Sequence, residues 1–130
     1  MNRARPFLPL LVALLVGCGG SGVTHSRPNF SVLTAEEMQA GQYGSVYDAV
    51  LALRSNWLRE RPPSDYLGEV PERAEVFQDG LRVGTAEYLR QLPVRDVEAV
   101  RYLTVAEAAT EFGRQANAVP VIAITMKRGP

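Results

Sequence analysis

The sequence predicts an α+β fold, a small domain with a short mixed sheet and three to four helices. Three observations support this prediction. Apolar residues follow Ser45 at the spacing of one helix face, and Asp79-Gly80 separates two short apolar runs as a two-residue hairpin turn does. The run Val121–Met126 is rich in β-branched residues and lies between Pro120 and Lys127, which favours a strand.

Two helices are expected in the first half of the domain. Thr34 is a suitable N-cap for a short helix that ends near Gly41, and Glu37 stands at the capping-box position three residues later. Ser45 caps a second helix, which Pro62-Pro63 ends. One face of that helix is formed by Val46, Val50, Leu53 and Trp57. A loop rich in Pro and Glu, residues 61–73, is expected to follow.

Strands dominate the expected second half. They cover residues 74–78, 81–83, 98–103 and 121–126, with the Asp79-Gly80 turn between the first two. A short helix over residues 85–92 stops before Pro93. Thr104 caps a further helix, which Gly113 ends.

Composition excludes several classes of protein. The chain has 130 residues, 14 Lys and Arg against 14 Asp and Glu, and one cysteine. This length allows one domain with a modest core and excludes a large multidomain enzyme. The balanced charge argues against a nucleic-acid binder, which normally carries an excess of basic residues. One cysteine can form neither an internal disulfide nor a Cys-rich zinc site.

Residues 1–17 have the form of a secretory signal peptide. Arg3 and Arg5 precede an apolar run, residues 7–16, in which only Pro9 is not strongly apolar. This run is too short to cross a bilayer, because a helix needs about 20 residues to span roughly 30 Å of hydrocarbon. The pattern therefore predicts export and not a transmembrane anchor.

The apolar run ends in Leu15-Val16-Gly17-Cys18, which resembles the lipobox of bacterial lipoproteins. The resemblance implies cleavage before Cys18, a diacylglyceryl thioether on its sulfur, and an acyl chain such as palmitate on the new amino terminus. Two or more acyl chains on one residue give stable membrane anchoring. The alternative is an ordinary signal peptide with an incidental cysteine.

Residues 18–29 are expected to form a lipid-anchored flexible tether, because they are mostly small and polar. An Asp after the lipidated cysteine often retains Gram-negative lipoproteins at the inner membrane, so Gly19 favours the outer membrane. The expected organisation is thus a signal peptide at residues 1–17, a tether at 18–29 and an α+β domain at 30–128.

The residue inventory argues against an enzyme. The single histidine, His25, lies in the expected tether, and Cys18 is assigned to the lipid. Nucleophilic catalysis with an imidazole base and metal sites of the His/Cys type therefore lack candidates. The glycines do not match a phosphate-binding loop. No catalytic residue, cofactor or metal is expected.

Two pairs of acids leave a two-carboxylate hydrolase open as a minor alternative. Glu107 and Glu111 stand one helical turn apart, and Asp96 and Glu98 are close in sequence. The expected role of all four is a solvated helix or loop face.

The second half of the chain also resembles a known domain. EVFQDGLR at residues 75–82 is followed by LPVRDVEAVRYL at 92–103, a helix ending in Phe112-Gly113, and VIAITMK at 121–127. Their order is similar to that in the plug domain of TonB-dependent outer-membrane receptors. With the opening helices included, the resemblance covers residues 31–127.

The chain departs from the plug pattern in two places. Residues 114–120 replace a Gly-rich turn, and only three residues follow Lys127, where receptor plugs continue into a long β-barrel. A plug without a barrel cannot gate a pore, so the resemblance implies a binding or accessory role.

The expected function is a non-enzymatic outer-membrane lipoprotein with a plug-like binding or accessory domain. Its expected partners are the membrane, through the acyl chains, and an envelope protein such as a transporter, with no nucleic acid. The alternative is a structural envelope lipoprotein without a dedicated ligand.

Overall fold

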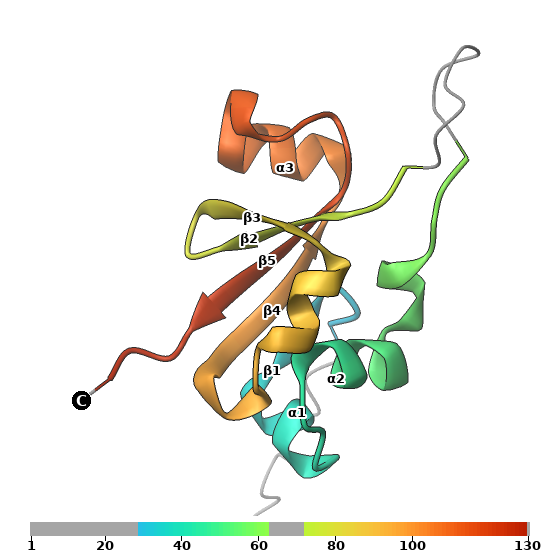
Figure 1. Ribbon diagram of the computed structural model, residues 1–130. Coiled ribbons are helices and arrows are strands. Elements are labelled where there is room, and N and C mark those ends of the chain that lie inside the picture. Colours follow the sequence, from blue (N-terminus) through green and yellow to red (C-terminus); the bar gives the residue numbers. More distant parts are fainter. Residues whose placement is uncertain (1–28, 63–71, 130) are drawn as a thin grey trace, which may run out of the picture.

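The computed structural model describes residues 29–62 and 72–129. Their five strands form one mixed sheet in the order β1-β4-β5-β2-β3 (Figure 1). The strands are β1 (Val32–Thr34), β2 (Glu75–Gln78), β3 (Leu81–Thr85), β4 (Val97–Leu103) and β5 (Val121–Met126). Strands β2 and β5 are parallel, and the other pairs are antiparallel. The α+β class and the hairpin turn at Asp79-Gly80 are thereby confirmed.

The helices lie on both faces of this sheet (Figure 1). The α-helices are α1 (Ala35–Ala40), α2 (Val46–Leu53) and α3 (Val105–Phe112). Four 3-10 helices accompany them: Ser55–Leu58, Ala86–Gln91, Val94–Asp96 and Gly113–Gln115. Among the residues that the structure describes, no helix combines the length and the apolar character needed to cross a membrane.

The helix starts agree with the predicted caps. The Thr34 hydroxyl accepts a hydrogen bond from the backbone N–H of Glu37, and the Glu37 carboxylate accepts one from the N–H of Thr34. Thr104 and Glu107 form the same capping box at α3. The Ser45 side chain accepts a hydrogen bond from the backbone N–H of Asp48 in α2. Each cap satisfies helix donors that have no partner inside the helix.

Alternating side chains of the central strands divide the core in two. Ile122 and Ile124 of β5 face the side covered by α1 and α2, whereas Val121 and Ala123 face α3. We call the two clusters the α2-side core and the α3-side core. The α3-side core is held together partly by stacked rings of Phe77 and Phe112, whose centroids are 4.3 Å apart. The α2-side core includes Leu33, Met38, Val46, Val50, Trp57, Val76, Leu89, Val97 and Val100.

The prediction of one continuous helix from Ser45 to Pro62-Pro63 is wrong, because α2 ends at Leu53. The next residue, Arg54, has φ −144° and ψ 46°, outside the helical region. Its guanidinium donates instead to the Val32 carbonyl. Trp57 is buried as expected, but within the 3-10 helix Ser55–Leu58.

Three other elements differ from the sequence prediction. The helix expected over residues 85–92 is a 3-10 helix, Ala86–Gln91, and β3 extends to Thr85. Strand β1 was not predicted, although Leu33 within it is fully buried. In the expected loop, Arg61 and Glu72 exchange two backbone hydrogen bonds of 2.9 Å, while residues 63–71 lie outside the described residues.

Strand β3 forms one edge of the sheet, and its pairing with β2 is irregular. Val76 pairs with Gly84, but the next residue of β2, Phe77, pairs with Arg82. Val83 is therefore an extra residue in β3, which makes a β-bulge, and Gly84 beside it has φ +146°.

Candidate functional site

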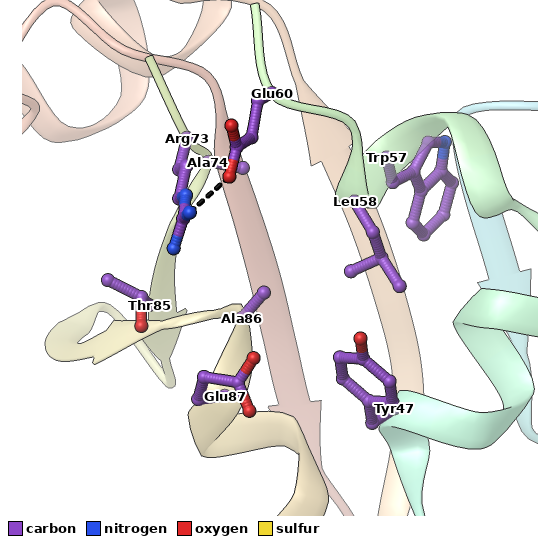
Figure 2. A pocket seen from close by; sticks show the side chains of 9 residues that line it. All are labelled: Tyr47, Trp57, Leu58, Glu60, Arg73, Ala74, Thr85, Ala86 and Glu87. Atoms are coloured by element: carbon purple, nitrogen blue, oxygen red, sulfur yellow. Dashed lines mark hydrogen bonds and ion pairs between the residues drawn. The ribbon is translucent and has the colours of Figure 1, made fainter. Parts of the chain in front are cut away.

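A partly enclosed cleft lies between α2 with the 3-10 helix that follows it and the open end of the β2–β3 hairpin, away from the Asp79-Gly80 turn. Its volume is about 200 Å³, and Figure 2 shows the nine side chains that line it. We call it the α2–β3 cleft. Its lining comes from α2, from the 3-10 helix Ser55–Leu58 and the residues after it, from the two residues before β2, and from the end of β3 with the residues after it.

Aromatic side chains form one wall of the α2–β3 cleft. The Tyr47 hydroxyl points into the cleft, and Trp57 lies behind Leu58 (Figure 2). The Arg90 guanidinium lies 3.6 Å from the centroid of the Tyr47 ring and donates a 2.7 Å hydrogen bond to Glu87. That hydrogen bond raises the pKa of Arg90. The cation over the ring and its carboxylate partner thus hold the Tyr47 ring in place.

Polar groups form the opposite wall. Arg73 and Glu60 make an ion pair at the upper end of the cleft in Figure 2, and Thr85 presents its hydroxyl below them. Both members of the pair are largely exposed, with 64% and 47% of their side chains accessible. Because an exposed pair contributes little stability, its groups can exchange partners at small cost.

The two carboxylates that line the α2–β3 cleft both have basic partners. In this cleft, Glu60 is paired with Arg73 and Glu87 with Arg90. Neither histidine nor cysteine is among its lining residues. In the part of the chain that the structure describes, no group of three or more His, Cys, Asp or Glu side chains could hold a metal ion.

The first predicted acid pair lies elsewhere, at an open groove between β4 and α3. Glu107 and Glu111 line this groove, which has a volume of about 440 Å³. Glu111 accepts two hydrogen bonds from Arg101, of 2.6 and 3.2 Å. Hydrogen bonds from the backbone and side chain of Thr104 lower the pKa of Glu107. A catalytic acid needs a raised pKa, so Glu107 is unsuited to that role, and Glu111 is engaged by Arg101.

The second pair, Asp96 and Glu98, is exposed and flanks the start of β4. Asp96 lies 3.7 Å from Arg95, and its backbone carbonyl accepts a hydrogen bond from Lys127. These acids line neither the α2–β3 cleft nor the groove beside α3. Both acids are exposed to solvent, as expected, but they lie on the 3-10 helix Val94–Asp96 and on β4 and not on a loop.

Comparisons of the chain with protein-family models, with curated proteins and with solved structures found no match. The likeness to receptor plugs therefore depends on the order of the sequence motifs. The lipobox residues Leu15, Val16, Gly17 and Cys18, and also His25, lie outside the described residues. Lipidation of Cys18 stays a prediction.

The α2–β3 cleft was not predicted from the sequence. Its lining residues are spread from Tyr47 to Glu87, and no two neighbouring cleft residues form a recognisable motif. The available signals were indirect. Tyr47 stands beside the buried face of a predicted helix, and Thr85 follows a predicted hairpin.

Proposed function

We propose that this chain is a lipid-anchored protein of the bacterial cell envelope, located at the outer membrane, with a plug-like binding domain that has no catalytic activity. The observation that supports the anchor is the sequence Leu15-Val16-Gly17-Cys18 directly after a short apolar run. Cys18 is the chain's single cysteine, so a thiol occurs only where the lipobox requires it.

The order of elements supports the plug-like part of the proposal. The motif ending in Asp79-Gly80 forms a β-hairpin, the segment after Pro93 leads into β4, and the helix ending in Phe112-Gly113 is followed by β5. The hairpin, strand, helix and final strand thus occur in the succession that the resemblance implies.

The α2–β3 cleft supports binding as the role of the domain. The hydroxyl groups of Tyr47 and Thr85 can exchange hydrogen bonds with a polypeptide backbone, and the ring of Tyr47 offers apolar contact. The Glu60–Arg73 pair adds one charge of each sign at the rim. A short segment of an envelope protein, with a transporter as the first candidate, matches this combination of groups.

The anchor is tested by changing Cys18 to Ser. The wild-type chain is expected to lose residues 1–17 and to incorporate radiolabelled palmitate, and Cys18→Ser to do neither, because only the thiol can form the thioether. Cys18→Ser combined with Ser21→Cys is the matched control, since it keeps a thiol but moves it out of the lipobox. A Cys18→Ser chain that is fully processed and still partitions with membranes would contradict the proposal.

Binding at the cleft is tested by filling it. Thr85→Tyr places a large ring on an exposed strand position that lines the cleft, and Thr125→Tyr makes the same change at an exposed position of β5 outside it. After crosslinking in intact envelopes, Thr85→Tyr is expected to reduce recovery of the partner about tenfold, as loss of one or two good contacts would. Thr125→Tyr should leave it unchanged.

Two outcomes of the crosslinking would count against binding at the cleft. Equal recovery with both variants would place the partner elsewhere on the domain. Absence of any specific envelope protein with the wild-type chain would favour a structural lipoprotein. Circular dichroism of each variant checks that its fold is intact.

A further inference from the structure

Three large apolar side chains are exposed around the last turn of α2. Phe30 is 74% exposed, Leu51 is 51% and Leu53 is 37%. Leu51 and Leu53 belong to that turn but lie on different sides of it, because residues two positions apart in a helix do not share a face. Arg54 connects Leu53 to Phe30. The Arg54 guanidinium donates to the Leu53 carbonyl and lies 5.9 Å from the centroid of the Phe30 ring. We call Phe30 and Leu53 the α2-end patch.

Phe30 is presented on a locally ordered turn. The backbone carbonyl of Asn29 accepts a hydrogen bond from the N–H of Val32, and its side-chain oxygen accepts one from the N–H of Ser31. On the other side of this turn, Arg54 also donates to the Val32 carbonyl. The ring is therefore held at the surface, next to α2, and contributes nothing to either core.

The position of Phe30 in the sequence indicates what covers the patch. Phe30 follows Cys18 by 12 residues. A chain of that length reaches at most about 40 Å when fully extended, and about 20 Å on average as a flexible coil. A lipid anchor on Cys18 would therefore keep the α2-end patch close to the bilayer surface at all times. Even a weak tendency of these side chains to enter the bilayer then leads to contact, because the tether gives the patch a high effective concentration at the membrane surface.

The chemistry of the patch matches a lipid surface. Phe and Leu side chains are the residues that enter the boundary between head groups and acyl chains in proteins that lie on a membrane. The fourth exposed large apolar residue of the described chain, Leu81, begins β3 at the opposite edge of the sheet from β1. Apolar exposure is thus concentrated on the side where the domain connects to the anchor.

We propose that Phe30 and Leu53 contact the lipid surface to which Cys18 is attached, so that the domain rests on the bilayer through the end of α2. The β3 edge of the sheet then faces away from the membrane. This inference rests on the proposed lipid anchor and adds the orientation of the domain to it.

The orientation is tested with tryptophan at two sites. Lipidated Phe30→Trp and Leu81→Trp chains, processed to begin at Cys18, are reconstituted into vesicles of phosphatidylethanolamine and phosphatidylglycerol with brominated acyl chains, which quench tryptophan on contact. Emission of the parent chain is subtracted, because Trp57 is buried in all of them. The added emission of Phe30→Trp should fall about threefold, as for a side chain at the head-group boundary, and that of Leu81→Trp should not.

The outcomes separate this inference from the proposed function. Wild-type protein that floats with the vesicles while Phe30→Trp is quenched no more than Leu81→Trp would overturn the orientation and leave the anchor intact. Wild-type protein that carries no lipid and does not float would overturn both. A Cys18→Ser chain that sediments as a dimer, and as a monomer once Phe30→Ser is added, would assign the patch to a second copy of the chain and overturn contact with lipid.

Discussion

Arg54 joins the beginning of the domain to the end of α2. Its side chain is 9% exposed and donates to the Glu37 carboxylate, at 3.0 Å, as well as to the carbonyls of Val32 and Leu53. Its Nε is buried without a partner. Glu37 therefore serves two purposes, as the capping residue of α1 and as the counter-charge of Arg54, although its own side chain is 41% exposed.

The ionisation of Glu37 reflects both purposes. Partial burial alone would raise the pKa of Glu37, but the hydrogen bond from the Thr34 backbone and the contact with Arg54 outweigh it and lower the pKa below its ordinary value of 4.5. A carboxyl with a lowered pKa in the folded state stabilises the fold above its unfolded pKa. That contribution is lost as the pH falls through the folded pKa.

We therefore expect Glu37→Gln to lower the free energy of unfolding by about 1 kcal/mol near neutral pH, an upper value for a pair in which one side chain is 41% exposed. The difference from wild type should shrink on acidification below pH 4.5, where the carboxyl becomes neutral in the unfolded chain and then in the fold. Urea unfolding of both chains at several pH values, followed by Trp57 fluorescence, measures this difference in the free energy of unfolding. Glu98→Gln is the exposed control, and a difference independent of pH would contradict the assignment.

At the scale of elements, the β2–β3 hairpin depends on two residues with positive φ. Asp79 has φ 47° and Gly80 has φ 86°, the signature of a tight turn that matches the twist of its strands. Asp79 also accepts a hydrogen bond from the backbone N–H of Met126, which joins the turn to β5. The turn therefore helps to set the register of β2 against both of its neighbours.

Gly80→Ala should lower the free energy of unfolding by about 1 kcal/mol, because the left-handed region is unfavourable for a residue with a Cβ. A Cβ at Gly80 or at Gly44 would meet no atom within 4 Å, but only Gly80 has a positive φ. Gly44→Ala is thus the matched control and should change stability by a few tenths of a kcal/mol at most. Equal losses in the two variants would show that backbone conformation is not the cause.

Elements defined by neighbouring residues could be predicted, and those defined by distant partners could not. The N-caps at Thr34 and Thr104 and the turn at Asp79-Gly80 involve residues within three positions of one another. The end of α2 depends on contacts of Arg54 with residues 17 and 22 positions away. Strand β1 is formed by only three residues, which pair with β4 in the second half of the chain. Periodicity along the sequence contains no trace of such partners.

For the whole molecule, the central strands belong to two cores at once. Each of β4 and β5 contributes to the α2-side core with one set of side chains and to the α3-side core with the other. Unfolding of one core alone would disrupt strands that also carry the other core, so we expect the two cores to unfold together.

The α2–β3 cleft opens from the α2-side core, where Trp57 is at once a core residue and part of the lining. Its shape therefore depends on the packing of that core, which no sequence motif specifies.

Under the proposed lipid anchor, the β-bulge in β3 bears on how many copies of the chain could share a membrane. Proteins confined to a surface meet one another far more often than in solution, and a regular strand at the rim of a sheet invites a neighbouring copy to pair with it and begin aggregation. The extra residue Val83 and the unusual backbone of Gly84 interrupt that rim. At the opposite rim, β1 offers only three residues. Crowded neighbours should therefore diffuse past one another as separate molecules.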